Sequence, residues 1–138
     1  LPRVFINEWM AKNRNTLPDP ADGAADDWIE LYNVAATNVP LAGWYLSDDP
    51  GNLQKWPIPS GSILASSRMS FDEVTGFHSP ITTGFGLDKA GEQVLLAYLP
   101  GTSSNRVVDA IQFKGQENYF ISCQPYFIIF AFRIRVLL

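Results

Sequence analysis

The sequence is poor in the residues that build metal centres and covalent active sites. Among its 138 residues it has one cysteine, Cys123, and one histidine, His78. A single cysteine excludes an internal disulfide framework and a zinc site made of several thiolates. Cys123 and His78 are the only residues available for a cysteine–histidine nucleophile, and the pattern offers no third group to orient the base. Nucleophilic catalysis is therefore not expected.

Charge is also scarce, and no basic run is present. Charged residues make up 17% of the chain, with 14 acidic against 10 basic residues and a formal net charge of −4. A nucleic-acid-binding surface needs clustered lysine and arginine to neutralise phosphates, so nucleic acid is not an expected partner. The length corresponds to one domain, which at this size buries roughly two-thirds of its unfolded surface without a metal or disulfide.

Long hydrophobic runs are absent as well. The longest apolar stretch, Tyr126–Phe132, is too short for a membrane-spanning helix, and Arg133 and Arg135 interrupt the apolar residues after it, so a membrane partner is not expected. From Phe132 onward apolar residues and arginines alternate, which is typical of an edge strand. The chain opens at Leu1 without the apolar core of a signal peptide, and we expect it to be a piece of a longer protein.

The sequence does contain alternation of apolar and polar residues over short segments. Such alternation predicts β-strands, and turn residues bound each segment. The expected strands lie at about 3–10, 26–33, 41–49, 54–58, 62–71, 92–99 and 107–113. No window has a convincing helical stripe. This pattern predicts an all-β antiparallel sandwich or small barrel.

Six motifs follow one another along the chain: INEWM, DDWIELYN, LAGWYLSDD, WPIPSG, FGLDKAGEQVLLAY and VVDAIQF. In this succession, from about Val4 to Gln116, the chain resembles the lamin-tail domain in its bacterial, extracellular form. The resemblance implies an immunoglobulin-like antiparallel β-sandwich over residues 1–116. It also implies a module without catalysis, appended to a large secreted or cell-surface protein. The related animal domain is the globular tail of nuclear lamins, where it is an interaction module.

The chain departs from the family pattern in two places. Before the central aromatic strand, Ala65–Arg68 lacks the glycine that the family commonly has in that turn. A different turn or a strained residue is therefore expected there. After Gln116 the polar continuation of the family is replaced by a nearly apolar segment. Residues 117–138 are interpreted as a divergent C-terminal segment that forms a closing or edge strand.

Two carboxylates break the strand pattern. Glu8 shares the parity of Val4 and Ile6, and Asp109 shares the parity of Ile111, so strict alternation points both side chains inward. An unpaired buried carboxylate costs several kcal/mol, so each would need hydrogen-bond donors. A β-bulge that shifts the parity is the main alternative. We interpret Glu8 and Asp109 as structural polar anchors, although a hydrolase that used them as a carboxylate pair is a competing hypothesis.

The polar segment 12–27 is a second candidate site. It holds Asp19, Asp22, Asp26 and Asp27, and clustered aspartates can supply oxygen ligands to calcium. The spacing does not match an EF-hand loop, because a glycine follows directly after Asp22 and no glutamate closes the span. Solvated turn residues are the commoner reason for such a run, so calcium remains a secondary hypothesis and no other cofactor is expected.

The four tryptophans divide into two pairs. Trp44 and Trp56 have the parity of core residues. Trp9 shares a face with Phe5, and Trp28 shares a face with Tyr32. If these faces are exposed, Trp9, Trp28 and Tyr32 would form an aromatic surface for a sugar ring or a protein partner; the alternative is that the segment 12–27 covers them.

The resemblance to lamin-tail domains implies a non-catalytic interaction or spacer module of a larger secreted or cell-surface bacterial protein. Its expected location is extracellular, and its expected partner is a protein or a cell-surface polysaccharide. A calcium-dependent carbohydrate-binding module that uses Trp9, Trp28 and the acidic segment is the alternative function.

Overall fold

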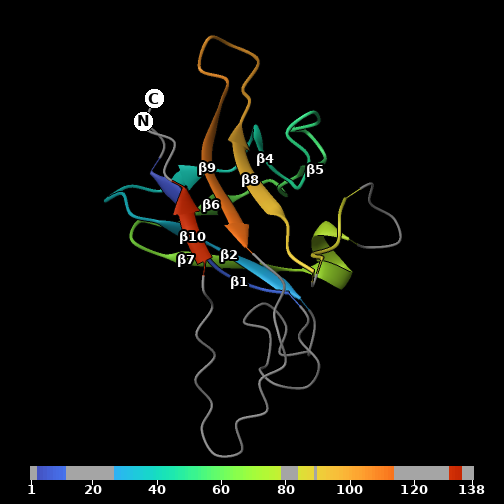
Figure 1. The fold of residues 1–138 in the computed structure, drawn as a ribbon. Helices are drawn as coiled ribbons and strands as arrows, with labels where there is room; N and C mark the ends of the chain where they lie inside the picture. Colours follow the sequence, from blue (N-terminus) through green and yellow to red (C-terminus); the bar gives the residue numbers. More distant parts are fainter. Residues whose placement is uncertain (1–2, 12–26, 79–83, 89, 114–130, 135–138) are drawn as a thin grey trace, which may run out of the picture.

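A computed structural model describes residues 3–11, 27–78, 84–88, 90–113 and 131–134, the last of these by their backbone (Figure 1). Its regular structure is nearly all β. The strands are β1 (Val4–Met10), β2 (Trp28–Asn33), β3 (Val39–Pro40), β4 (Trp44–Ser47), β5 (Trp56–Pro57), β6 (Ser62–Ile63), β7 (Arg68–Asp72), β8 (Gln93–Tyr98), β9 (Arg106–Phe113) and β10 (Ala131–Ile134). One helical turn, η1 (Glu73–Phe77), follows β7.

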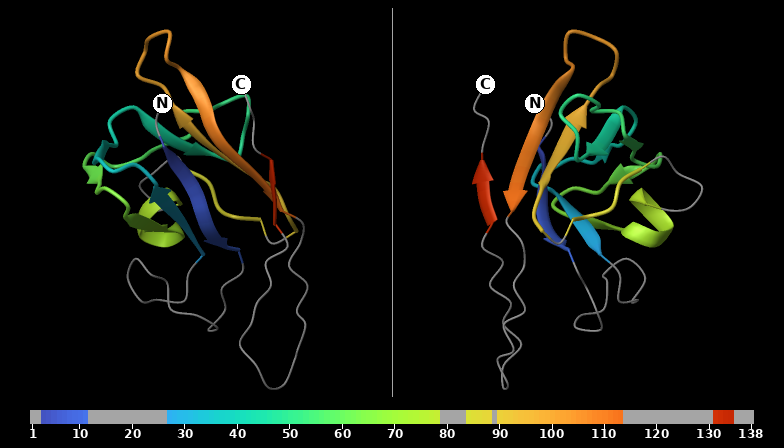
Figure 2. Two further views of the ribbon diagram at one scale, coloured as in Figure 1. Left: turned by 90° about the vertical axis from the view of Figure 1, so that its left-hand side faces the viewer. Right: turned by 45° about the vertical axis from the view of Figure 1, so that its right-hand side comes forward.

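The strands form two facing antiparallel sheets, so the predicted immunoglobulin-like β-sandwich is confirmed (Figure 2). One sheet has three strands in the order β1-β2-β7, and the other has five in the order β10-β9-β8-β4-β5. A two-stranded pair, β3-β6, completes the described structure. Strands β1 and β9 bring the two sheets into contact along one side.

Side chains that alternate along the strands fill the space between the sheets. Trp44 and Trp56 are 1% and 4% exposed, which confirms their predicted place in the core. Trp44 packs against Tyr98 with ring centroids 5.1 Å apart, and Trp56 meets Phe71 edge-on at 5.4 Å. Aromatic pairs in these geometries add to the stability gained from burial. The core therefore reaches from the centre of the five-stranded sheet to β7 in the other.

The predicted strand 62–71 is in fact two strands, because the chain turns between β6 and β7. The N–H of Ser67 donates to the carbonyl of Leu64 at 3.2 Å, and Ser66 has a positive φ of 52°. A side chain at this left-handed φ is strained, whereas glycine is not. The expectation of a strained residue in the glycine-free segment Ala65–Arg68 is confirmed.

The helical turn η1 was not expected, since five residues are too few to show a helical period. Its N-cap is Asp72, whose carboxylate accepts hydrogen bonds from the backbone N–H and the hydroxyl of Thr75, both at 2.6 Å. Aspartate is a favoured cap because it satisfies N–H groups that the first turn leaves free. This cap ends β7 and turns the chain away from the sheet.

The C-terminal segment contributes an outer strand. Strand β10 pairs with β9, with Ala131 opposite Phe113, and lies at the edge of the five-stranded sheet. The expected boundary at residues 116 and 117, and most of the apolar run 126–132, lie outside the described residues. Within the described part of the chain, no helix is long and apolar enough to cross a membrane.

Candidate functional site

A bulge in β1 decides which residues reach the surface. Ile6 lies opposite Leu31 in β2, but the next paired residue, Glu8, lies opposite Glu30, so Asn7 is an extra residue in the ladder. An extra residue reverses the alternation beyond it. Trp9 consequently packs inside, 5% exposed, and Glu8 is exposed. The β-bulge that the sequence analysis gives as the alternative to an inward Glu8 is therefore observed, and Trp9 lies on the inner face, not on the face of Phe5 that the alternation gave it.

Asp109 does point inward, as the alternation predicts, and it joins the two sheets. It is 3% exposed, and its Oδ2 accepts a hydrogen bond from the backbone N–H of Ile6 at 2.9 Å. Strand β1 is the edge of its sheet, so a main-chain N–H on its open side needs an acceptor from elsewhere. A carboxylate is a strong acceptor for such a group. Asp109 in β9 thus holds β1 to the opposite sheet.

Asn33 has a similar structural role at the end of β2. It is fully buried, and its side-chain oxygen accepts from the backbone N–H of Ala35 at 2.9 Å. Its amide nitrogen lies 2.8, 3.1 and 3.0 Å from the carbonyl oxygens of Thr37, Ile63 and Leu64. One side chain therefore fixes the loop after β2 and the turn after β6.

The outer face of the three-stranded sheet carries a polar cluster centred on Glu30. Glu30 is 9% exposed, and its carboxylate accepts from the amide of Asn7 at 2.7 Å and lies 3.5 Å from the Ser70 hydroxyl. The Nε of Arg68 is 3.4 Å from the same carboxylate. The Arg68 guanidinium also lies 4.8 Å from the centre of the Tyr32 ring, a cation–π geometry. Arg68 is thus held from two sides while its side chain remains 58% exposed.

The predicted aromatic surface of Trp9, Trp28 and Tyr32 is not assembled in the structure. Trp9 belongs to the inner face, whereas Trp28 and Tyr32 share the outer face. Trp28 is only 5% exposed, and its indole N–H has no hydrogen-bond partner among the described residues. Tyr32 reaches solvent in part, but Arg68 lies over its ring. Arg68 and Glu8 are therefore exposed charged groups of this face.

The calcium hypothesis falls mostly outside the described residues, which include only Asp27 of its four aspartates. The carbonyl of Asp27 accepts from the N–H of Glu73 at 2.7 Å, which joins the start of β2 to η1. Among the residues that the structure describes, no three or more histidine, cysteine, aspartate or glutamate side chains form a group able to hold a metal ion. Calcium binding by Asp19, Asp22, Asp26 and Asp27 stays a secondary prediction.

His78 lies beside a carboxylate. Its Nδ1 is 3.1 Å from Oε1 of Glu73, and both residues lie in or directly after η1. Burial raises the pKa of Glu73; the hydrogen bond to His78 opposes this rise, and the nearby charge of Asp27 adds to it. Cys123, the other member of the cysteine–histidine hypothesis, lies outside the described residues. The observed partner of His78 is thus Glu73.

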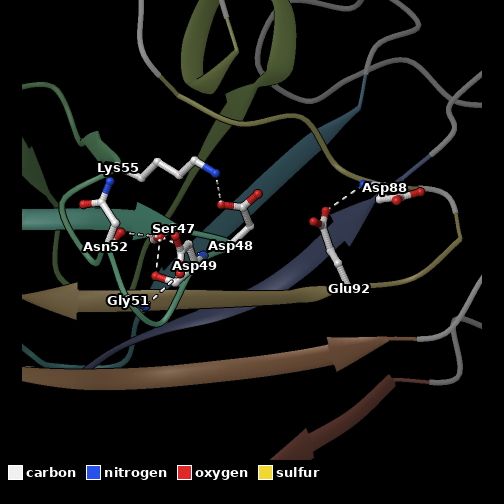
Figure 3. Close-up of polar contacts among 8 residues, drawn as sticks. All are labelled: Ser47, Asp48, Asp49, Gly51, Asn52, Lys55, Asp88 and Glu92. Atoms are coloured by element: carbon white, nitrogen blue, oxygen red, sulfur yellow. Dashed lines mark hydrogen bonds and ion pairs between the residues drawn. The ribbon is translucent and has the colours of Figure 1, made fainter.

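A second group of carboxylates lies where two loops meet at the start of β8 (Figure 3). Oε1 of Glu92 accepts from the backbone N–H of Asp88 at 2.7 Å, and Lys55 Nζ contacts Oδ1 of Asp48 at 2.6 Å. Burial, with the charges of Asp48 and Asp88, raises the pKa of Glu92 to about 7, while the Asp88 N–H and Lys55 oppose the rise. Glu92 is therefore a group that titrates near neutral pH.

The loop beside Glu92 is fixed by its own side chains. The hydroxyl of Ser47 donates to the carbonyl of Asn52 at 2.7 Å and accepts from the N–H of Asp49 at 2.9 Å. Oδ1 of Asp49 accepts from the N–H of Gly51 at 2.8 Å. These bonds close the turn that the segment Asp49–Asn52 predicts and hold Asp48 near Glu92 (Figure 3).

Sequence reasoning missed the cluster of Asn7, Glu30 and Arg68, and also Glu92. Glu30 shares the parity of Trp28 and Tyr32 in the motif WIELY, so its place on their face was available from the sequence. Its partners were not, because Arg68 and Ser70 are about forty residues away in the chain and the register between β2 and β7 is a tertiary property.

No model of a known protein family matches the chain, and no curated protein matches it. The resemblance to lamin-tail domains accordingly depends on the order of the six motifs.

Proposed function

We propose that the chain is a non-catalytic interaction or spacer module of a larger secreted or cell-surface bacterial protein, similar to bacterial lamin-tail domains. The observation that supports this proposal most is that buried polar side chains form hydrogen bonds with the main chain. Asp109 and Asn33 are 3% and 0% exposed, and each forms a hydrogen bond with the main chain of a segment distant in the sequence, whereas the buried Ser47 bonds the main chain of the loop that follows it. The first two side chains hold the sandwich together and the third fixes a turn, as a scaffold requires.

The carboxylate pair of the competing hydrolase hypothesis is not brought together. Glu8 is exposed on the outer face, whereas Asp109 is 3% exposed and bonded to Ile6. A hydrolytic pair needs both carboxyl groups on the two sides of one cleft, about 5 to 10 Å apart. The different surroundings of Glu8 and Asp109 favour a module without turnover.

Calcium separates this proposal from the alternative, a calcium-dependent carbohydrate-binding module. A ligand that binds only the native state stabilises it, by about 2.7 kcal/mol at a hundred times its Kd, or roughly 10 °C in Tm for a chain of this size. We expect the melting temperature with 5 mM calcium and with EDTA to agree within about 1 °C. A calcium-dependent rise of several degrees would favour the alternative.

Binding and turnover are tested on the same polysaccharides. The chain is sedimented with insoluble peptidoglycan, chitin and cellulose, and the supernatant is assayed for new reducing ends. An interaction module is retained by a polysaccharide or protein partner and releases no reducing ends. Release of reducing ends that the double variant Glu8→Gln/Asp109→Asn abolishes would instead establish a hydrolase and contradict the proposal.

A further inference from the structure

Strand β7 is an open edge of the three-stranded sheet. Within the part of the chain that the structure describes, β2 is the only strand that pairs with it (Figures 1 and 2). It has five residues, Arg68–Asp72, and is longer than β3, β5 or β6. An exposed strand edge presents unpaired N–H and C=O groups and is a template for another strand. Edge strands of this kind bind extended peptides by main-chain pairing.

The hydrogen-bond pattern shows which main-chain groups of β7 face outward. Asn33 N–H donates to Ser67 C=O at 2.9 Å, and Glu73 N–H donates to Asp27 C=O at 2.7 Å. Both bonds join residues that are directly opposite, so in this antiparallel ladder the odd-numbered residues of β7 bond to β2. The even-numbered residues, Arg68, Ser70 and Asp72, consequently direct their N–H and C=O groups toward the open edge.

The two faces of this edge differ in chemistry. On the inner face, Met69 and Phe71 pack against the core but are only partly buried, because no described strand lies beyond them. On the outer face stands Arg68, which Glu30 and Tyr32 hold in place. A strand added to β7 would cover Met69 and Phe71 with its apolar side chains. Its side chain opposite Arg68 would lie within about 5 Å, where a carboxylate pairs with guanidinium.

We propose that β7 binds an extended peptide segment of a partner protein as an added antiparallel strand, in which apolar residues alternate with polar ones and an acidic residue lies opposite Arg68. This inference rests on the proposed interaction function and names its partner class. The main-chain hydrogen bonds at Arg68 and Ser70 supply affinity. The Arg68 guanidinium, together with the apolar side chains of Met69 and Phe71, determines which peptide side chains are preferred and in which register the peptide binds.

The test measures fluorescence anisotropy of a labelled peptide with the full chain. The peptide Gly-Gly-Thr-Val-Thr-Val-Glu, when antiparallel to β7, places its glutamate opposite Arg68 and its second threonine opposite Ser70. Replacing the glutamate by glutamine should weaken binding about fivefold, and by lysine more. Methylating the backbone nitrogen of the second threonine removes a main-chain bond without touching the protein, and should weaken binding about tenfold.

Two protein variants locate the site. Arg68→Ala should abolish the preference for glutamate over glutamine, whereas Arg3→Ala, which removes the same charge from an exposed residue just before β1, should leave it unchanged. Equal affinity for the methylated peptide, no binding, or a dimer through β7 that the peptide does not disrupt would each overturn the inference. Retention on a polysaccharide without any binding of the peptide would overturn it, but would leave the proposed interaction function standing.

Discussion

Replacing Glu92 by glutamine should stabilise the protein at high pH and not at low pH. The pKa of Glu92 in the folded protein is raised from 4.5 to about 7, chiefly by burial. The folded state therefore holds the proton more tightly than the unfolded state, so between pH 4.5 and 7 the free energy of unfolding falls as pH rises. Below pH 4.5 this destabilisation is absent, and above pH 7 it is complete.

The size of the change in the free energy of unfolding follows from the difference between the pKa of Glu92 in the unfolded and in the folded state. About 2.5 pH units at about 1.4 kcal/mol each give an upper limit of about 3.4 kcal/mol. Glu92 is only half-buried, so solvent screening reduces this to about 1–2 kcal/mol. Glutamine keeps an oxygen that accepts from the Asp88 N–H but carries no charge to repel Asp48 and Asp88. At pH 8 the variant should be more stable by that amount, or by about 4–8 °C in Tm.

The assay is thermal and urea unfolding of the wild type and Glu92→Gln at half-unit steps from pH 4 to pH 8.5. The control is Glu8→Gln, which makes the same change of charge at an exposed position and should shift stability by less than about 0.5 kcal/mol. The reasoning fails if the curves of Glu92→Gln and wild type run parallel over the whole range, or if Glu8→Gln reproduces the shift.

Three further substitutions test the polar groups and the strained turn, each by urea unfolding at pH 7. Asp109→Ala leaves the N–H of Ile6 without its acceptor and should cost about 2–3 kcal/mol; a loss below about 0.5 kcal/mol would mean that the bond does not join the sheets. Asn33→Ala removes bonds to four main-chain groups and should cost about 2–4 kcal/mol; a neutral result would contradict its role between the loops. Ser66→Gly relieves a φ of 52° and should stabilise by about 0.5–1 kcal/mol; destabilisation would show that the serine is not strained.

Alternation along the chain was enough to predict the sandwich, although strands β2 and β8 are largely buried on both faces. The prediction from alternation failed in β1, where the pairing with β2 has one extra residue. The bulge at Asn7 turned Glu8 outward and Trp9 inward. A charged residue at the parity of Val4 and Ile6 is the sequence signal for such a bulge, but the sequence does not settle whether the ladder gains a residue there. The short strand β3 and the turn η1 are also too brief to carry a period.

The candidate site was less predictable than the fold. The inward direction of Asp109 followed from parity, but its partner Ile6 lies 103 residues away in the sequence. Arg68 was noticed only as the end of a turn without glycine, and its contact with Tyr32 depends on the register of β7 against β2. Contacts of this kind arise from the packing of whole sheets, which one sequence does not specify residue by residue.

The proposed binding of a peptide strand to β7 is tested most directly by amide hydrogen exchange. The exchange rates are monitored residue by residue by NMR, with and without the glutamate peptide. In the free protein, the N–H groups of Met69 and Phe71, which face β2, should exchange slowly, and those of Arg68 and Ser70 should exchange fast. Saturating peptide should slow exchange at Arg68 and Ser70. Unchanged exchange at both residues, or protection confined to another strand, would contradict this account.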